Sequence, residues 1–484
     1  MAKTLEGLEP KNLWKHFAEF VKIPHCSGNE KALGDYIISV AEKLDLDWKR
    51  DDVGNVVIAK PGSSGHENAP GVILQGHLDM VCEKNSDVDH DFKKDPIQAR
   101  IDGDWVKAEG TTLGADNAIG CCAGLAVMED DSLTHPPLEC LFTVDEETGL
   151  TGATKLQEGF LTGRILLNLD SEDEGEFTIG CAGGADTLIS LGLSREDALE
   201  GQLYKIMLSG LRGGHSGVDI NQGRGNAIKL LSRILWQVMR NIPFKLVGFE
   251  GGNLRNAIPR EAWAHVLLDP VQKDAFIVQA QDAFDKIKAE YKAIETDPAL
   301  AINTGDESAR PPLTKQSQKS LINLLLTLPH GVLAMHPEID GLVETSNNLA
   351  VMRTHDDKAE IICSTRSSVA SALEATRNTL NALGEIVEAE VKLEEGYPGW
   401  TPNLESPILK TLTEVYRRTF SADPEVAAIH AGLECGIIGE KFPGMDMISF
   451  GPTIKHPHSP DERVHIGSVE KFWTFLTTVM ATLA

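Results

Sequence analysis

The chain has 484 residues, of which 42% are hydrophobic and 24% are charged, as is usual for a folded globular protein. This length exceeds the about 250–300 residues at which one hydrophobic core stops growing, so two or more domains are expected. The formal net charge of −27 argues against a nucleic-acid partner or an anionic membrane surface, because phosphate binding needs clustered Lys and Arg.

The cysteines form no CxxC pair and stand at positions 26, 82, 121, 122, 140, 181, 363 and 435. Several lie in apolar runs, where a free thiol behaves as a small hydrophobic side chain. The first residues lack the apolar core of a signal peptide, and no run approaches the about 18 apolar residues of a membrane span. We therefore expect reduced cysteines and a cytoplasmic location.

The N-terminal part of the chain alternates between helical and extended patterns. Helices are predicted over residues 11–22, 30–44 and 117–130, and strands over 55–59, 72–75, 138–144 and 165–169. The third helix is rich in Ala, Gly and Cys, so it can pack closely on a sheet. This alternation predicts an α/β fold, in which helices flank a mixed, largely parallel sheet.

From about residue 187 the pattern changes to strands that alternate like half-exposed β-structure. Strands are predicted near 203–211, 244–249, 262–268, 343–353 and 358–365, and helices near 226–240, 271–293, 317–327 and 368–383. This order suggests two copies of a strand–helix–strand–strand–helix unit. A helix at 405–420 and a buried strand at 448–450 follow. We expect an α+β domain over 187–387, inserted into a first domain of residues 1–186 and 388–484.

Five polar clusters stand where apolar runs end or helices begin. In VILQGHLDMVCEK (72–84), His77 and Asp79 lie two residues apart, so their side chains face the same way beyond the strand. The others are LGADNAIG (113–120), FTVDEETG (142–149), LLNLDSEDEG (166–175) and HPHSPDE (456–462). Each alone is more often a helix cap or a solvated acid than a site. Together they indicate a metal site of His, Asp and Glu without Cys, which suits zinc, manganese or cobalt.

The order G-H-x-D, G-A-D-N, D-E-E-x-G, N-x-D-S-E and H-S-P-D-E resembles the M20 family of di-metal aminopeptidases and dipeptidases, across essentially the whole chain. GHLDMVCEK, LGADNAIG and HPHSPDERV are most similar to its bacterial aminoacyl-histidine dipeptidase branch. The resemblance implies a metal-dependent dipeptidase acting on unblocked L-dipeptides, including those ending in histidine, with two divalent ions, zinc ahead of cobalt or manganese. A deacylase or tripeptidase of the same family is the alternative, and a non-catalytic metal- or peptide-binding protein is a more distant one.

The resemblance also implies a set of metal ligands. His77 and Asp170 would hold one ion, and Asp116 would bridge both. Glu147 and His458 would hold the second ion. In HPHSPDE either histidine could be the ligand by residue type alone, and the family pattern selects His458 over His456.

Two further residues beside these ligands receive roles from the resemblance. Asp79 would accept a hydrogen bond from the ring N–H of His77 and so fix its tautomer. Glu146 would act as the general base, taking a proton from the attacking water and passing it to the leaving amine. Family structures also imply a cis peptide bond between Asp116 and Asn117.

The insert contributes candidate substrate and oxyanion residues. His215 in LRGGHSGVDI is a loop histidine by residue type alone, and the resemblance makes it the lid residue that stabilises the oxyanion. Asn256 and Arg366 match lid positions that contact substrate, and Arg366 could bind the C-terminal carboxylate of a dipeptide. In HAGLECG (430–436), His430 and Glu434 are either a helix cap and its first turn or part of the pocket wall. The family resemblance favours a homodimer.

Overall fold

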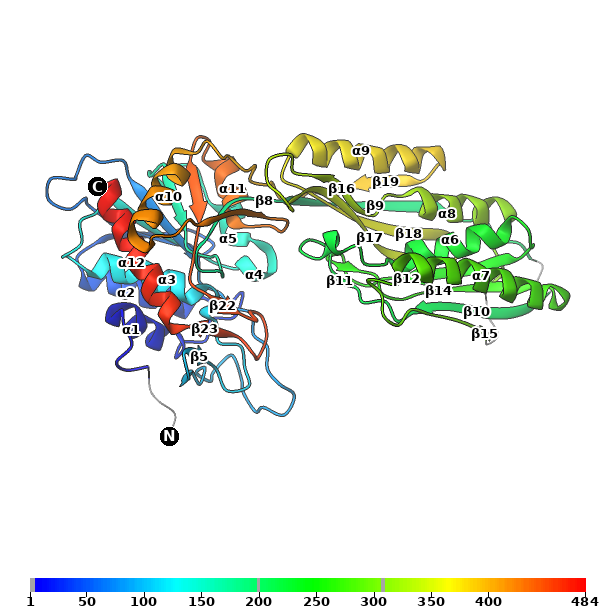
Figure 1. Cartoon of the computed structure of the whole chain (residues 1–484), viewed down its shortest axis with the longest axis horizontal. Coiled ribbons are helices and arrows are strands. Elements are labelled where there is room, and N and C mark those ends of the chain that lie inside the picture. The colour runs from blue at the N-terminus through cyan, green and yellow to red at the C-terminus, as the bar shows by residue number, and fades with distance from the viewer. Residues whose placement is uncertain (1–4, 198–200, 306–309) are drawn as a thin grey trace. The chain divides into compact units, whose positions relative to one another are not determined.

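The computed structural model describes residues 5–197, 201–305 and 310–484, and the chain divides into two compact units (Figure 1). The first unit comprises residues 1–181, 400–428 and 433–484, and the second comprises residues 182–399 and 429–432. The sequence predicted these boundaries at 186/187 and 387/388. The short return of 429–432 to the second unit has no signal in the sequence pattern.

The first unit is built on an eight-stranded sheet in the order β1-β2-β6-β3-β7-β21-β8-β20. The strands β6, β3, β7 and β21 at its centre are parallel, whereas β1 and β2 on one side and β8 on the other pair antiparallel. A second, four-stranded sheet has the order β22-β23-β5-β4. The strands are β1 (Asp47–Arg50), β2 (Val56–Lys60), β3 (Val72–His77), β4 (Arg100–Asp102), β5 (Trp105–Lys107), β6 (Leu138–Thr143), β7 (Ile165–Asn168), β8 (Glu176–Cys181), β20 (Glu425–Ile429), β21 (Asp446–Ser449), β22 (Ile454–Lys455) and β23 (Arg463–His465). The predicted α/β fold with a largely parallel sheet is confirmed.

Helix α3 packs closely on this sheet, and its composition explains the contact. At Gly124 an added Cβ would lie 2.4 Å from the Sγ atom of Cys140 on β6, and at Gly120 it would lie 2.3 Å from the carbonyl oxygen of Leu169. Only small residues allow this approach. The helices of the unit are α1 (Lys11–Phe20), α2 (Lys31–Lys43), α3 (Ala115–Glu129), α4 (Glu146–Gly149), α5 (Thr151–Lys155), α10 (Pro407–Phe420), α11 (Glu434–Lys441) and α12 (Ile466–Leu483).

The second unit contains an antiparallel sheet in the order β15-β10-β14-β12-β17-β18-β9-β19, with β16 paired to β17. Read from its two edges to its centre, the sheet repeats one pattern, β15-β10-β14-β12 and β19-β9-β18-β17. The chain order also repeats, as α6-β12-β14-α7-β15 and α8-β17-β18-α9-β19, with the short β13 between β12 and β14 in the first copy and β16 between α8 and β17 in the second. The second unit is therefore doubled, although β9, the counterpart of β10 in the second half, comes before both halves in the sequence.

One hydrophobic core joins one face of this sheet to all four long helices, including Leu231 of α6, Phe276 of α7, Leu325 of α8 and Leu380 of α9. The helices are α6 (Ala227–Met239), α7 (Lys273–Tyr291), α8 (Lys315–Thr327) and α9 (Ala370–Ile386). The strands are β9 (Gly183–Gly192), β10 (Gln202–Ser209), β11 (Gly214–His215), β12 (Lys245–Gly251), β13 (Ala257–Ile258), β14 (Ala262–Leu268), β15 (Ala299–Thr304), β16 (Gly331–Met335), β17 (Val343–Thr354), β18 (Lys358–Ser367) and β19 (Glu390–Leu393). The insert thus has the α+β architecture that its sequence predicts.

The expectation of reduced cysteines is wrong at one pair. Cys26 and Cys82 form a disulfide, and the remaining cysteines are free and buried. The loop that carries Cys26 runs beside the segment that follows β3, where the amide of Met80 donates to the carbonyl of His25. The predicted cytoplasmic location rested partly on reduced thiols and remains a prediction without that support.

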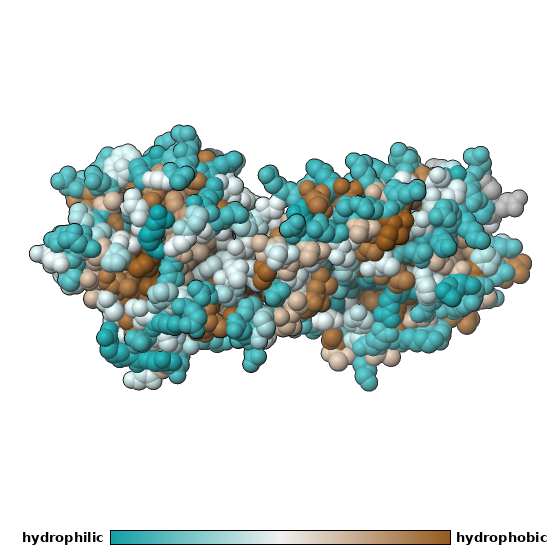
Figure 2. Space-filling model, turned by 90° about the horizontal axis from the view of Figure 1, so that it is seen from above, coloured by the Kyte–Doolittle hydropathy of each residue, from teal (hydrophilic) through white to brown (hydrophobic). Residues whose placement is uncertain are grey.

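The face of the molecule seen in Figure 2 is predominantly hydrophilic, as the acidic composition leads one to expect. In Figure 2 hydrophilic residues cover most of the visible face, and hydrophobic residues form separate small clusters. Among the helices described by the structure, none has the length and apolarity that a membrane span requires.

Candidate metal centre

The predicted ligands of the first unit converge because the strands that carry them are parallel. His77 is the last residue of β3, Glu147 follows the end of β6 in α4, and Asp170 follows the end of β7. The carboxyl ends of neighbouring parallel strands meet at one edge of a sheet, where open α/β sheets bind their ligands. Asp116 reaches this edge from the first turn of α3, and His458 reaches it from the loop between β22 and β23.

Asp116 lies between two groups of ligand atoms and belongs to both. The Nε2 atom of His77 is 3.2 Å from Oδ1 of Asp116 and 3.3 Å from Oδ1 of Asp170. On the other side, Nε2 of His458 is 3.2 Å from Oδ2 of Asp116 and 3.0 Å from Oε2 of Glu147. Within each triad the ligand atoms lie within 4.8 Å of one another. One carboxylate thus presents an oxygen to each of two sites, as a bridging ligand does.

The electrostatics of this cluster fit bound cations. Burial raises the pKa of Asp170 to about 6, and the carboxylates of Asp116 and Glu147 add to this shift against the opposing effect of His77. Hydrogen bonds to Asp116 and Glu147 raise the pKa of His458 to about 11. One oxygen each of Asp170 and Glu147 is buried without a hydrogen-bond partner in the described structure. Gathered, under-satisfied carboxylates are costly unless cations hold them, and this nitrogen and oxygen donor set suits zinc, manganese or cobalt.

A further acidic group nearby consists of Glu30, Asp79 and Asp145. Here the carboxylates are already used by the chain, since Glu30 accepts from the amides of Gly28 and Asp145 at 2.8 and 3.1 Å. The carboxylate of Asp145 accepts from two threonine hydroxyls of the following turn. The hydrogen bonds of this group indicate a structural role rather than a third metal site.

Asp79 makes contacts that differ from those expected of it. The Nδ1 atom of His77 donates to the main-chain carbonyl of Asp79 at 3.0 Å, while the nearest carboxylate oxygen lies 3.5 Å away. The carboxylate itself accepts from the amides of Glu146 at 2.9 Å and Glu147 at 3.1 Å, and from the hydroxyl of Ser27 at 2.7 Å. Asp79 therefore orients both the His77 ring and the turn that carries Glu146 and Glu147.

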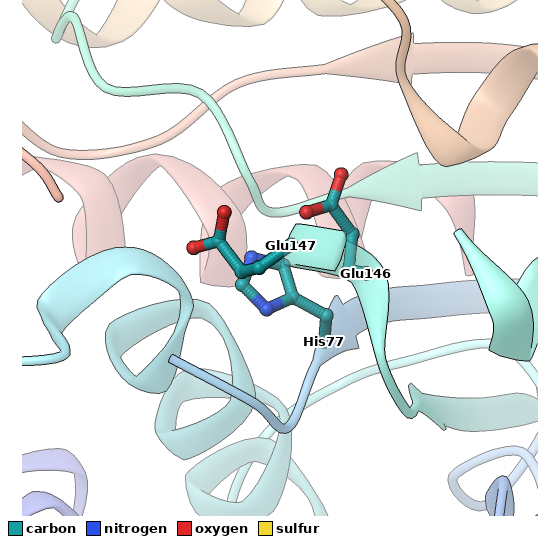
Figure 3. Close-up of side chains that lie close together, drawn as sticks. All are labelled: His77, Glu146 and Glu147. Atoms are coloured by element: carbon teal, nitrogen blue, oxygen red, sulfur yellow. The ribbon is translucent and has the colours of Figure 1, made fainter. Parts of the chain in front are cut away.

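Glu146 lies beside the ligands without taking part in either triad centred on Asp116. Figure 3 shows its carboxylate and that of Glu147 extending from α4 in diverging directions next to the imidazole of His77. These three residues also form a group within 4.8 Å. Burial raises the pKa of Glu146 well above its ordinary value, and the carboxylates of Asp170 and Glu434 add to this effect. Such a group is suited to exchanging protons.

The structure also distinguishes the two histidines of HPHSPDE. His458 lies in the cluster, whereas His456 belongs to none of the groups of ligand atoms found among the described residues. The peptide bond between Asp116 and Asn117 is cis, as the family resemblance implied.

Within the second unit the structure brings His215 and Asn256 together. The amide of Ser216 donates to the carbonyl of Asn256 at 2.8 Å, and His215 pairs with Ala257 between β11 and β13. The Nδ1 atom of His215 accepts from the amides of Gly217 and Val218, both at 3.2 Å. The proton of the neutral ring is therefore on Nε2. Burial and the nearby Arg366 lower the pKa of His215, which keeps the ring neutral.

Arg366 and His430 lie near His215 in the same unit. Burial lowers the pKa of His430 to about 4, with a further contribution from Arg366. The ring of His430 is hydrogen-bonded through Nε2 to the hydroxyl of Ser346 at 2.7 Å. Arg366 is buried and donates to the hydroxyl of Tyr397 at 2.9 Å, but it forms no ion pair within the described part of the chain. A buried guanidinium without a carboxylate partner is suited to an anionic ligand.

Glu434 belongs to the first unit, so the HAGLECG segment is divided between the two units. Its Oε2 atom accepts from Gln75 at 2.6 Å and from Thr143 at 2.7 Å, while Oε1 is buried without a partner in the described structure.

The sequence assigned no role to two acidic residues near the candidate ligands, Glu172 and Glu462. Burial, with the charges of Asp116 and Asp170, raises the pKa of Glu172 to about 8.

Comparison with known proteins places the chain in a family. The model of peptidase family M20/M25/M40 matches residues 73–482. The chain belongs to peptidase family M20/M25/M40. This match confirms the predicted family, and it also confirms the prediction that the chain is an enzyme that hydrolyses peptide bonds.

Two relatives in the M20 family match along nearly the whole chain. The cytosol non-specific dipeptidase of Escherichia coli (strain K12) is 44% identical over 479 residues, covering 98% of both chains. The crystal structure of aminoacylhistidine dipeptidase from Vibrio alginolyticus is 43% identical and covers 100% of this chain and 98% of that one, with a TM-score of 0.92. Aminopeptidase PepT from Bacillus cereus, at 15% identity and a TM-score of 0.58 over 98% of this chain and 99% of its own, shares the fold.

Proposed function

We propose that this M20 family member is a metal-dependent dipeptidase that hydrolyses unblocked L-dipeptides, including those with a C-terminal histidine. The observation that carries the proposal is the position of Asp116, which offers one carboxylate oxygen to each of two ligand triads. The names of the E. coli and Vibrio relatives support the choice of dipeptides and of aminoacyl-histidine.

The residues of the first unit would hold two divalent ions, zinc ahead of cobalt or manganese. His77 and Asp170 would bind one ion, Glu147 and His458 the other, and Asp116 both. When bound, such ions acidify a water molecule and polarise the peptide carbonyl. Glu146 would accept the proton of the attacking water and deliver it to the leaving amine. Asp79 would keep Glu146 in place through its hydrogen bond to the Glu146 amide.

The second unit would supply the groups that recognise the substrate. His215 would donate its Nε2–H to the oxyanion, because its Nδ1 atom is occupied by two amides. Arg366 would bind the C-terminal carboxylate, and Asn256, His430 and Glu434 would be further substrate-contacting residues. The homodimer indicated by the resemblance remains a prediction, as does zinc as the native metal.

The proposal is tested by metal content together with initial rates on a panel of peptides. We expect two bound ions per chain, fast hydrolysis of aminoacyl-histidine and other free dipeptides, and loss of activity with a chelator. Tripeptides and N-acylated amino acids should react far more slowly. Faster hydrolysis of N-acyl amino acids would identify a deacylase, and faster hydrolysis of tripeptides a tripeptidase. Metal binding without hydrolysis of any member would identify a binding protein.

A separate prediction concerns Arg366. In Arg366→Lys the charge remains, but the planar fork that can form two parallel hydrogen bonds to a carboxylate is lost. Hydrogen bonds to charged groups contribute about 1.5–3 kcal/mol, so kcat/KM for a free dipeptide should fall by about 10- to 100-fold, mainly through KM. The same substitution should leave the already slow hydrolysis of dipeptide amides nearly unchanged. Equal losses for dipeptides and dipeptide amides would contradict the assignment.

A further inference from the structure

Glu462 is a buried carboxylate at the far end of the loop that carries His458. It accepts hydrogen bonds from four consecutive backbone amides. Its Oε2 atom accepts from Leu113 at 2.7 Å and Gly114 at 2.9 Å, and its Oε1 atom accepts from Ala115 at 2.7 Å and Asp116 at 3.3 Å. These bonds occupy the lone pairs of both oxygens, so Glu462 is not itself available as a metal ligand.

The amides that donate to Glu462 lie at the entry to α3: Leu113 and Gly114 precede the helix, and Ala115 and Asp116 are its first two residues. The helix has no cap from the side chain at its own N-cap position. The residue at the N-cap position is Gly114, which has no side chain to cap the amides. Its φ of 72° turns the chain so that successive N–H groups point to one place, and an added Cβ would lie 2.8 Å from the Sδ atom of Met80. The helical conformation is interrupted at Asp116 and Asn117, and buried amides at such a helix start need acceptors from elsewhere. Glu462 supplies these acceptors from a distant part of the chain.

The hydrogen bonds of Glu462 join the segment that carries Asp116 to the segment that carries His458, and both residues are candidate metal ligands. Asp116 is held through its own amide, and His458 stands four residues before Glu462 in a short loop. Within that loop the amide of Glu462 donates to the carbonyl of Ser459 at 3.0 Å, and the hydroxyl of Ser459 donates to the carbonyl of His456 at 2.8 Å. His458 has a φ of 59°, a conformation that a non-glycine residue keeps only when its surroundings hold it.

We propose that Glu462 is a positioning residue that locks the Asp116 and His458 segments together, so that the ligand atoms are in place before any metal arrives. The inference rests on the proposed function only in taking this cluster as the metal site. Removing Glu462 would free both segments at once and lower the affinity for metal. Partners that orient metal ligands typically change metal affinity by about 10- to 100-fold when they are replaced.

The test is Glu462→Gln, which keeps the shape of the side chain. A carboxamide has one oxygen acceptor, and its NH₂ group would face two of the four amide donors, so those two hydrogen bonds are lost. We expect the dissociation constant for Zn²⁺, measured by competition with a chromophoric chelator, to rise by about 10- to 100-fold. We also expect the visible absorption spectrum of the Co²⁺-loaded protein to change. Neither measurement depends on a peptide substrate.

Glu139 offers a matched control in the same unit. It is also buried, and it accepts from the amides of Thr162 and Gly163 at 2.8 and 2.7 Å, at the opposite end of β6 from the metal ligands. Glu139→Gln should lower the melting temperature to a similar extent and leave the metal dissociation constant within about twofold of the parent. Parent-like affinity in Glu462→Gln, or an equal loss in Glu139→Gln, would overturn the proposal.

A second variant covers the case in which Glu462→Gln does not fold. Glu462→Asp keeps the charge on a shorter side chain, so it should fold and bind metal more weakly than the parent. Parent-like metal affinity in Glu462→Asp would then overturn the positioning role. The outcome is separate from the dipeptidase proposal, since a parent protein that binds two ions and hydrolyses no dipeptide would refute that proposal alone.

Discussion

Glu146→Gln is expected to lower kcat for a free dipeptide by about 10²- to 10⁴-fold while the protein keeps its full metal content. The substitution keeps the size of the side chain but removes its capacity to accept a proton from water. The amide of Glu146 would still donate to Asp79, because that bond uses the main chain. The fold around α4 should therefore remain as it is.

The role of Glu146 is decided by measuring the metal content and the turnover rate of the same Glu146→Gln preparation. Glu146 lies in a group with His77 and Glu147 in which ligand atoms are within 4.8 Å, so it could also be a ligand. If Glu146→Gln lost a metal ion, Glu146 would be a metal ligand, and this result would contradict the general-base assignment. The matched variant is Glu147→Gln, which we expect to lose metal from the His458 side and to lose activity for that reason.

The pH profile gives a second check with a defined sign. Burial raises the pKa of Glu146, and bound cations would oppose that shift by favouring the charged carboxylate. Glu146 accepts a proton only when it is ionised, so kcat/KM should fall as the pH falls through its pKa in the loaded enzyme. This acid limb should be absent from the residual activity of Glu146→Gln. An unchanged acid limb would assign it to another group.

The convergence of the candidate metal ligands could be predicted from sequence because their positions follow from strand ends and from an ordered set of motifs. His77, Glu147 and Asp170 each come after an apolar run, and parallel strands bring such positions to one edge of the sheet. The contacts that hold these ligands follow no such rule. Glu462 caps a helix that begins 347 residues away in sequence at Ala115, and no local pattern marks that pairing.

Other features depended on tertiary contacts in the same way. Cys26 and Cys82 are 56 residues apart and form a disulfide, although neither lies in a recognisable cysteine motif. The carboxylate of Asp79 accepts hydrogen bonds from two backbone amides of α4. The sequence alone indicated only that Asp79 lies close to His77. The strand β9 belongs to the second half of the sheet in the second unit but precedes both repeated segments in the sequence, so the sequence pattern of the repeat was incomplete there.

His215→Ala is expected to lower kcat by about 10²- to 10³-fold, the usual loss when one oxyanion donor is removed, with a smaller change in KM. The amides of Gly217 and Val218 both donate to Nδ1, so protonating that atom would place three N–H groups against one another. The ring is therefore a neutral Nε2–H donor rather than an acid. Its contribution should stay constant from neutral to mildly acidic pH, because burial and Arg366 lower its pKa.

The control for this variant is His336→Ala in the same unit. The Nδ1 atom of His336 accepts from the amides of Glu338 and Ile339 at 3.2 and 3.1 Å, which reproduces the local arrangement around His215. Loss of that arrangement alone should leave kcat within about twofold of the parent, since the local hydrogen bonds affect folding rather than the reaction. If His215→Ala kept the parent kcat, or if His336→Ala lost as much, the oxyanion role would be refuted. A loss of kcat in His215→Ala that His336→Ala does not share would agree with the oxyanion role of the His215 ring.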